Sequence, residues 1–344
     1  MYLLNIVVKA MMVASFCSAF EFMSNDHLKV ALGNPDHEWS LFERFREDFG
    51  KAYDNFDEMR DKFNIFKDNL KYIVEHNNNN YNSTLGITQF GDITHDEYQS
   101  YVNRSIYANA YNGDWRLRCD SYNGDGRHTD ETIDWRNEGV VNTPRDQGNA
   151  GTCWSFSTTT TVESAYAISN GKLYDLAEQQ LVDCDKRSQG TNGGLMENGF
   201  MYLISNGGQC LEQSYPYTAS DTTCHNCETV ISVSNCFGIE EGNELAMKEI
   251  VNQQPISVSL DASSREFQHY KSGVITSESC YKQLNHGVAV VGYGEENGVK
   301  YWIVKNSWGT SYGMDGYVLI GRTDDSYNKQ STCGIAMDSS YATV

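Results

Sequence analysis

Four residues along this sequence have the chemical types that thiol-based acyl transfer requires. Cys153 stands in Gly151-Thr152-Cys153-Trp154-Ser155-Phe156, where a turn leads into a helix, and Gln147 precedes it. His286 and Asn306 follow far downstream. Together they offer a nucleophile, a base to ionise it, an amide to orient the base and a donor for an oxyanion. Each alone is more readily a buried structural cysteine, a core histidine or a capping asparagine, so only the combination is informative.

The chemistry of a thiol explains why these types belong together. A free thiol has a pKa of roughly 8.5 and is mostly protonated at neutral pH. A helix N-terminus at Cys153 and an imidazolium at His286 would both favour the thiolate. The amide oxygen of Asn306 would hold one ring nitrogen of His286 and fix its tautomer. The Gln147 side chain and the Cys153 N–H would stabilise a tetrahedral oxyanion.

The spacing and the flanking residues of this set resemble the papain-like cysteine peptidases, and the cathepsin L-type branch in particular. His286 follows Cys153 by 133 residues (286 − 153), within the ~130–150 that is usual in that family. The resemblance covers roughly residues 36–344 and includes further motifs, which are Asn192-Gly193-Gly194, Asn285-His286-Gly287, Gly292-Tyr293-Gly294 and Asn306-Ser307-Trp308-Gly309. It implies hydrolysis of peptide bonds through a Cys153 acyl-enzyme, by an endopeptidase that needs no cofactor.

The region after Cys153 divides by pattern into two parts. Helices are predicted over Cys153–Asn170, where Gly171 is a stop signal, Ala177–Cys184 and Leu195–Ser205. Strands are predicted over Ile256–Leu260, Gly287–Tyr293, Tyr301–Val304 and Gly316–Ile320. We therefore expect an α+β fold, a papain-like two-lobe mature domain with a helical lobe and a β-barrel-like lobe, and an active site in the cleft between them.

Two amphipathic helices are predicted upstream, because apolar residues recur at three- and four-residue steps over Trp39–Phe49 and Met59–Ile73. The second helix resembles the pro-segment motif of cathepsin L-type zymogens, with Lys62 where arginine is usual. Gly86-x-Thr88-x-Phe90-x-Asp92 resembles the second pro-segment motif, with Thr88 where asparagine is usual. The resemblance implies a small α-helical pro-domain that inhibits the enzyme intramolecularly.

These features predict three segments. They are a signal peptide at 1–19, a pro-segment at 20–130 and a mature cysteine peptidase domain at 131–344. Within the pro-segment, the inhibitor domain occupies about 36–100 and an exposed linker 103–130. Activation is expected to cut the chain between about Arg127 and Asp134. Because native ion pairs of carboxylates such as Asp92 are lost on protonation, release is expected in acid.

The N-terminus indicates the secretory pathway. Lys9 precedes an apolar run, Ala10 to Ala19, that ends in the small residues of a cleavage site. An N-terminal anchor or a disordered end is the alternative. Sequons place candidate glycosylation sites at Asn82 and Asn103. The expected destination is a lysosome, an acidic vacuole or the extracellular space.

The charge of the chain limits its partners. Its 344 residues carry a formal net charge of −20, which argues against nucleic acid and anionic membranes. The partners that the resemblance implies are protein and peptide substrates, the chain's own pro-segment and cystatin-like inhibitors. We expect a monomer. The rival functions are an exopeptidase, a catalytically silent binding protein, and a stand-alone inhibitor formed by residues 36–100.

The ten cysteines fit an oxidising compartment. The resemblance implies two disulfides, Cys184–Cys224 and Cys280–Cys333. It assigns no partner to Cys210, Cys227 and Cys236, and an odd number remains after residue 130 once Cys153 is set aside. At least one of these thiols is therefore expected to be unpaired or to pair elsewhere. Cys119 lies in the predicted linker.

Two departures concern the same cross-link. The family usually has cysteines at the positions of Ala150 and Thr191. Both halves of that disulfide are absent together, which raises a question about the rigidity of the loop that carries Gln147. Cys224-His225-Asn226-Cys227 could be half of a zinc site, but no second ligand pair follows at zinc-like spacing. No metal site is predicted.

The resemblance also implies a substrate cleft. Its residues would be Gly193, Gly194, Leu195, Met196, Ser259, Leu284, Asn285, Gly287, Trp308 and Asp338. Most of them are apolar, which favours leucine or phenylalanine as the second residue before the scissile bond. Asp338 matches the floor of that pocket and could pair with arginine or lysine. The alternative is that Asp338 turns outward into solvent.

Overall fold

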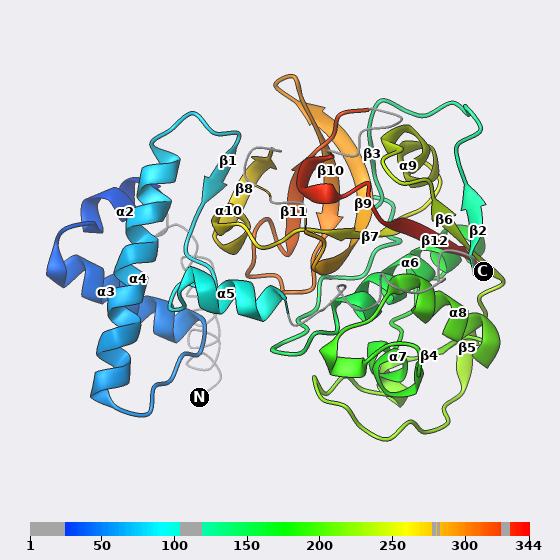
Figure 1. Cartoon of the computed structure of the whole chain (residues 1–344), viewed down its shortest axis with the longest axis horizontal. Helices are drawn as coiled ribbons and strands as arrows, with labels where there is room; N and C mark the ends of the chain where they lie inside the picture. Colours follow the sequence, from blue (N-terminus) through cyan, green and yellow to red (C-terminus); the bar gives the residue numbers. More distant parts are fainter. Residues whose placement is uncertain (1–24, 104–118, 277–279, 281–282, 325–330) are drawn as a thin grey trace, which may run out of the picture.

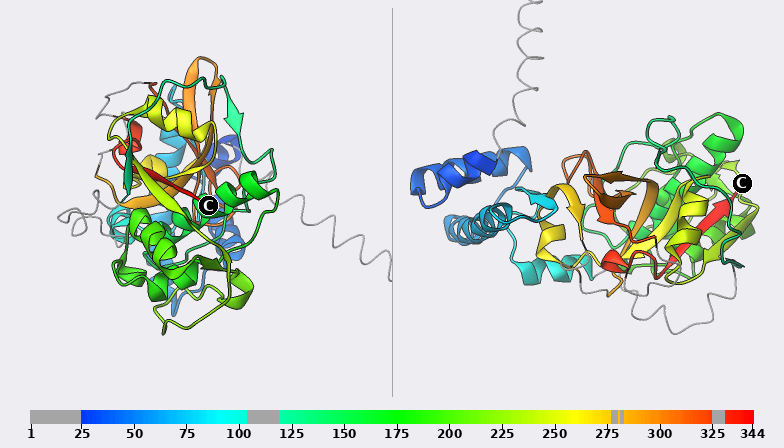
Figure 2. Two further views of the ribbon diagram at one scale, coloured as in Figure 1. Left: turned by 90° about the vertical axis from the view of Figure 1, so that its right-hand side faces the viewer. Right: turned by 90° about the horizontal axis from the view of Figure 1, so that it is seen from above.

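A computed structural model describes residues 25–103, 119–276, 280, 283–324 and 331–344; the predicted signal peptide at 1–19 lies outside these residues. Figure 1 shows three parts in a row: a helical unit made by the N-terminal residues, a lobe rich in strands, and a lobe rich in helices. Seen from above, the three parts keep this order (right view of Figure 2). The arrangement is the α+β architecture expected from the sequence.

The N-terminal unit consists of helices that their capping residues delimit. They are α2 (Asn25–Ala31), α3 (Pro35–Asp48), α4 (Phe56–Asn77) and α5 (His95–Val102). The side chains of Asn34 and Asn55 cap α3 and α4, and Thr94 forms a capping box with Glu97 on α5. The apolar stripes of α3 and α4 meet in an aromatic core around Phe42, whose ring contacts those of Trp39, Phe45, Tyr53, Phe63 and Phe66.

The motif residues of α4 tie this unit together. Lys62 binds Glu97 of α5 at 3.2 Å, and Asn69 donates to the carbonyls of Gly91 and Ile93 at 3.0 and 2.9 Å. Asp92 lies within the same unit, where it accepts from Lys51 and Tyr53. These contacts fix the loop between α4 and α5 against α4.

The helical lobe is built on α6 (Cys153–Asn170), which is buried along most of its length and ends at Gly171 in the left-handed conformation. Helices α7 (Glu178–Cys184) and α8 (Met196–Asn206) pack on α6, with the hairpin of β4 (Gln209–Cys210) and β5 (Thr229–Ile231). Short 3₁₀ turns complete the lobe at Gly190–Asn192 and Glu212–Ser214.

The other lobe is one large sheet. Its strands are β1 (Ser83–Leu85), β2 (Asp120–Tyr122), β3 (Ile133–Asp134), β6 (Asn235–Ile239), β7 (Ile256–Leu260), β8 (Tyr270–Ile275), β9 (His286–Glu296), β10 (Val299–Lys305), β11 (Tyr317–Gly321) and β12 (Ser339–Thr343). The strand order is β1-β8-β11-β10-β9-β7-β12-β6-β2, with β3 beside β9. Helices α9 (Glu244–Val251) and α10 (Arg265–Gln268) and the 3₁₀ turn at Thr332–Gly334 complete it. Both end strands, β1 and β2, come from the segment that precedes the predicted mature domain at 131–344.

The cysteines pair more completely than the sequence indicated. Cys184–Cys224 and Cys280–Cys333 are bonded, and Cys210 pairs with Cys227. Cys236 pairs with Cys119, so the predicted linker at 103–130 is structured from Cys119 onward. The odd count arose because the partner of Cys236 lies before residue 130. Among the described residues only Cys153 is a free cysteine.

No helix in the described part of the chain is long and apolar enough to cross a membrane. The described residues also hold no cluster of potential metal ligands. The two cysteines of the Cys224-His225-Asn226-Cys227 motif are not thiolates that could bind zinc, because they form two different disulfides.

Replacing Phe42 by alanine should destabilise the N-terminal unit by about 3–5 kcal/mol, because it removes the ring at the centre of the aromatic core. Phe56→Ala is the matched control, since Phe56 is 68% exposed and its loss should change stability by less than about 0.5 kcal/mol. Urea unfolding of the full chain, followed by aromatic fluorescence, measures both. Equal unfolding midpoints for the two variants would contradict this description of the core.

Candidate active site

Cys153 begins α6 where the helical lobe faces the sheet. Its side chain is fully buried, and its Sγ accepts a hydrogen bond from the backbone N–H of Gly287 at 3.3 Å. The thiol therefore lies at the N-terminus of an 18-residue helix, where the helix dipole favours the thiolate. Gly287 comes from β9 in the other lobe, so this contact also places Cys153 beside His286.

His286 is oriented by Asn306, which follows β10. Its Nε2 lies 2.7 Å from Oδ1 of Asn306. Nδ1 is therefore the ring nitrogen that could exchange a proton with the thiol. The indole ring of Trp308 stacks on the imidazole with centroids 4.8 Å apart. Burial lowers the pKa of His286 to about 4, and the hydrogen bond to Asn306 opposes that shift. Burial in the covered site thus favours the neutral form of the imidazole.

Gln147 is held by hydrogen bonds on both sides of its amide. Ser307 Oγ donates to its Oε1 at 2.6 Å, and its Nε2 donates to the carbonyl of Ala150 at 2.7 Å. Because Oε1 is occupied by a donor, the amide NH₂ group faces the loop that leads to Cys153. Tyr217 Oη donates to the Gln147 carbonyl at 2.8 Å and fixes the backbone as well.

Hydrogen bonds span the place of the absent disulfide between Ala150 and Thr191. The N–H of Gly151 donates to the carbonyl of Thr191 at 2.7 Å. Asp221 in turn accepts from the N–H and the hydroxyl of Thr191 at 2.8 and 2.7 Å. The loop is thus restrained without a covalent link, which answers the question that the sequence raised.

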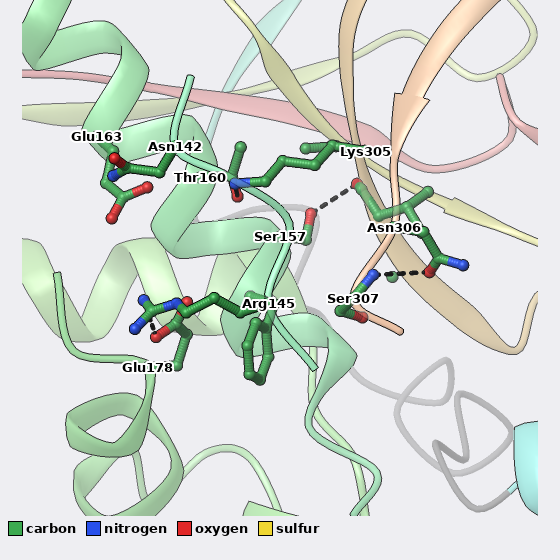
Figure 3. A pocket seen from close by; sticks show the side chains of 13 residues that line it. Asn142, Arg145, Ser157, Thr160, Glu163, Glu178, Lys305, Asn306 and Ser307 are labelled. Atoms are coloured by element: carbon green, nitrogen blue, oxygen red, sulfur yellow. Dashed lines mark hydrogen bonds and ion pairs between the residues drawn. The ribbon is translucent and has the colours of Figure 1, made fainter. Parts of the chain in front are cut away.

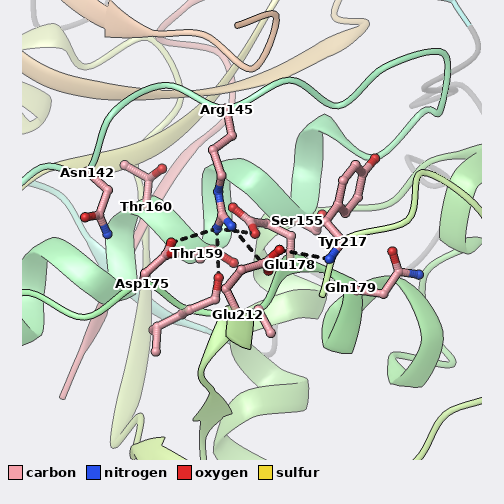
Figure 4. A network of polar contacts seen from close by, with 12 residues as sticks. Asn142, Arg145, Ser155, Thr159, Thr160, Asp175, Glu178, Gln179, Glu212 and Tyr217 are labelled. Atoms are coloured by element: carbon pink, nitrogen blue, oxygen red, sulfur yellow. Dashed lines mark hydrogen bonds and ion pairs between the residues drawn. The ribbon is translucent and has the colours of Figure 1, made fainter. Parts of the chain in front are cut away.

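Charged side chains lie behind the site, between the lobes (Figure 3). Lys305, the neighbour of Asn306, donates to Thr160 of α6 at 3.1 Å. Burial raises the pKa of Glu163, and the charge of Lys305 opposes this shift. Arg145 contacts Glu178, Asp175 and Glu212, the last two at 3.3 and 3.2 Å (Figure 4). This network joins the strand that carries Asn306 to the helix that carries Cys153.

The residues predicted for the substrate cleft lie around the same junction. A Cβ at Gly194 would approach the Trp154 ring to 2.6 Å, so a larger residue there would displace the ring. A Cβ at Gly287 would lie 3.1 Å from the Met196 sulfur, so a larger residue there would need that side chain to shift. Gly193 has a φ of +116°. Leu195 and Met196 are buried at the start of α8, and Leu284 is half-buried beside Gly334.

Asp338 is turned inward rather than into solvent. It is 4% exposed, and its Oδ2 accepts from the hydroxyl of Ser259 at 2.8 Å. The carboxyl of Glu197 is buried beside it, and burial together with the charge of Asp338 raises the pKa of Glu197 well above its usual range. Glu197 was not predicted from the sequence, because its only signal was its position next to Met196.

The N-terminal unit covers the catalytic residues. Around the Trp308 ring lie the rings of Phe90, Tyr98 and Tyr101, with centroids 5.1, 6.2 and 6.0 Å away. Gln89 donates to the Trp308 carbonyl at 3.2 Å.

Residues at the end of α5 contact the two loops that carry the predicted catalytic residues Gln147 and His286. Tyr101 Oη donates to the carbonyl of Gly148 at 2.8 Å. Asn285, the neighbour of His286, donates to Asn103 at 3.2 Å. Asn103 is also one of the two predicted glycosylation sites; the other, Asn82, is exposed just before β1.

Comparisons with known proteins agree with this geometry. The model described as papain family cysteine protease matches residues 129–343, and the cathepsin propeptide inhibitor domain matches residues 42–98. Germination-specific cysteine protease 1 of Arabidopsis thaliana is 40% identical over 354 residues, which cover 96% of this chain and 92% of that protein. Digestive cysteine proteinase 1 of Homarus americanus is 40% identical over 330 residues, which cover 92% and 97%.

Solved zymogen structures have the same fold. The recombinant stem bromelain precursor is 37% identical, with a TM-score of 0.81 over 89% of this chain and 99% of that one. Digestive procathepsin L 3 of Tenebrio molitor larval midgut is 34% identical, with a TM-score of 0.80 over the same shares. The chain therefore belongs to the papain family of cysteine proteases and is a zymogen that carries a cathepsin-type propeptide inhibitor domain.

Proposed function

We propose that this protease is an endopeptidase in which Cys153 is the nucleophile and His286 the general acid and base. The observation that supports this most directly is the position of the thiol, at a helix N-terminus and against the strand that begins with His286. Asn306 orients the imidazole through Nε2, so Nδ1 is the atom that exchanges a proton with the thiol.

The reaction then follows in two halves. The Cys153 thiolate attacks the carbonyl carbon of the scissile bond, and the Gln147 amide with the Cys153 N–H stabilises the oxyanion. His286 gives its proton to the leaving amine, and a thioester to Cys153 remains. His286 next takes a proton from water, whose oxygen attacks the thioester, and the acid leaves while the Cys153 thiolate and the protonated His286 are restored.

The substrates are proteins and peptides, and the expected inhibitors include cystatin-like proteins as well as the chain's own pro-segment. The enzyme is expected to be a secreted or vacuolar monomer, glycosylated at Asn82 and Asn103. A signal peptide, the family and four disulfides support the secretory route. No observation favours exopeptidase action over endopeptidase action.

Release of the pro-segment in acid has support in three histidines at its interface with the mature domain. His76 Nε2 lies 3.1 Å from the Ser83 hydroxyl, which donates to Glu266. His95 Nδ1 lies 3.2 Å from Gln268. His269 is buried beside Tyr72, with no hydrogen-bond partner for either ring nitrogen among the described residues.

Docking favours the neutral form of these imidazoles. Burial lowers the pKa of all three, to about 3 for His269, where the nearby charges of Arg265 and His95 act in the same direction. For His76 the charge of Glu266 opposes the shift, as does the hydrogen bond to Gln268 for His95. Histidines released into water regain a pKa near roughly 6.5 and bind protons below it. Docking is therefore strongest above about pH 6.5 and weakens as the pH falls from there towards the lowered values.

Replacing Cys153 by serine should abolish turnover and leave the zymogen folded, because the His286 pair cannot ionise a serine hydroxyl at working pH. The measurement is hydrolysis of a fluorogenic peptide after acid activation, with circular dichroism as the control for folding. More than trace activity in the serine variant would refute the assignment of the nucleophile.

Gln147→Ala should lower kcat by about 10²–10³-fold with a smaller effect on KM, since an oxyanion donor acts mainly in the transition state. Ser307→Ala, which removes only the donor to Gln147 Oε1, should give a smaller loss. Steady-state kinetics decide, and an unchanged kcat in Gln147→Ala would reduce this residue to a structural part of its loop.

The double variant His76→Gln/His95→Gln should need a lower pH for activation. It lacks two imidazoles that would bind protons once the pro-segment is released, so acid favours release less strongly. His37→Gln is the matched control, since His37 is exposed on α3. The measured quantity is the pH at which half of the zymogen is processed in a fixed time. Identical midpoints for all three proteins would show that other groups, such as carboxylates, control release.

Asp338 is expected to give the enzyme a second specificity. Leucine or phenylalanine should be accepted as the second residue before the scissile bond at every working pH, and arginine increasingly as Asp338 ionises. Asp338→Ala should lower kcat/KM for the arginine substrate by about 10- to 100-fold. Glu197→Gln leaves the Asp338 carboxyl in place and should retain the arginine activity. Equal Leu-to-Arg ratios in the wild type and Asp338→Ala across about pH 4–7 would exclude Asp338 from selectivity.

A further inference from the structure

The segment that begins at Cys119 is built into the catalytic domain, although it precedes the region that matches the protease family. Cys119 is bonded to Cys236, and the strand β2 that follows it runs parallel to β6. Its residues are in register with β6, with Asp120 opposite Phe237 and Tyr122 opposite Ile239. Cys236 is fully buried and Cys119 is 7% exposed, so the disulfide is shielded from solvent.

One carboxylate holds the turn after β2. Glu249 of α9 accepts from the hydroxyl of Tyr122 at 2.7 Å and from the backbone N–H groups of Asp125 and Gly126 at 3.0 and 2.9 Å. Gly124 and Gly126 have φ values of +87° and +72°, which bring the backbone around this side chain. The turn is thereby fixed to the surface of the mature domain.

Later residues continue along the same surface. The N–H of Asp130 donates to the Asn252 side chain at 2.8 Å, and its carbonyl accepts from Tyr293 at 3.1 Å. The chain then enters β3, which pairs with β9. The segment 119–134 is thus held to the catalytic domain at both of its strands, at the turn after β2 and at Asp130, while most side chains between these points are exposed.

The other edge of the sheet provides a contrast. There β1 of the propeptide pairs with β8 through backbone hydrogen bonds, and no disulfide joins the propeptide domain at 25–103 to the catalytic domain among the described residues. Strand β1 can therefore leave when the propeptide domain undocks. Strand β2 cannot leave, because its disulfide and its contacts to Glu249 do not involve the propeptide domain.

We propose that activation cuts the chain before Cys119, and that the mature enzyme keeps residues 119–134 as a disulfide-clamped N-terminal strand. Proteases need a segment that is free to adopt an extended conformation in their cleft, and residues 119–134 are restrained by the disulfide, by the pairing of β2 and β3 and by the hydrogen bonds to Glu249 and Asn252. The retained strand also covers the edge of β6, which would otherwise be open to pairing with another chain. This placement replaces the cut between Arg127 and Asp134 that was expected from the sequence.

Mass spectrometry of the activated enzyme tests this directly. The full-length zymogen is activated in acid, its free thiols are blocked, and the intact mass is measured before and after reduction, together with N-terminal sequencing. We expect a catalytic chain that begins before Cys119, and no peptide released by reduction. A chain that begins after Cys119 would overturn the proposal, whether Cys236 is then a free thiol or holds a short peptide that reduction releases.

A pair of variants tests the role of the clamp. In Cys119→Ser/Cys236→Ser the strand loses its covalent anchor, and we expect an additional N-terminus between Arg127 and Asp134. Cys210→Ser/Cys227→Ser is the matched control, because it removes a disulfide elsewhere and should keep the wild-type N-terminus. The same N-terminus in both variants would show that the disulfide does not protect the strand. If the first variant fails to fold, the mass of the wild-type enzyme still decides where the cut lies.

Discussion

The catalytic site depends on one contact between the lobes, where helix α6 meets strands β7 and β9. Ser157 of α6 donates to the carbonyl of Val288 at 2.7 Å, and Thr161 shares a hydrogen bond with Ser257 at 2.8 Å. Buried polar groups must be paired, so this row of hydroxyls determines how far the helix lies from the strands. One turn earlier along α6, the same register places the Cys153 sulfur 3.3 Å from the Gly287 N–H.

The thiol and the imidazole can form an ion pair only if their surroundings tolerate charge. In the zymogen, aromatic rings from the propeptide domain enclose Trp308 and, through it, His286, and burial lowers the pKa of the imidazole to about 4. The propeptide thus does more than block the cleft. It also buries His286, which favours the neutral imidazole and so disfavours an ion pair with the Cys153 thiolate. Undocking therefore has two effects: it opens the cleft to the substrate, and it exposes His286 to solvent, where an imidazolium can form.

Local signals predicted most of the fold. Gly171 marked the end of α6 and β-branched residues located β7, because these features depend on neighbours in the chain. The Cys119–Cys236 bond could not be predicted, since 117 residues separate its cysteines and spacing carries no information about pairing at that distance. For the same reason the pattern identified Asp338 but not Glu197, whose proximity arises only when α8 packs against the strand that follows Asp338.

The ion pair is the central claim, and the pH dependence of thiol alkylation tests it most directly. The rate at which iodoacetamide modifies Cys153 should be measured across pH in the acid-activated enzyme and in the intact zymogen. The account predicts rapid alkylation of the activated enzyme at pH values far below the roughly 8.5 of a free thiol, and a slow reaction of the zymogen throughout. An activated enzyme whose alkylation rate rises only near pH 8.5 would contradict it.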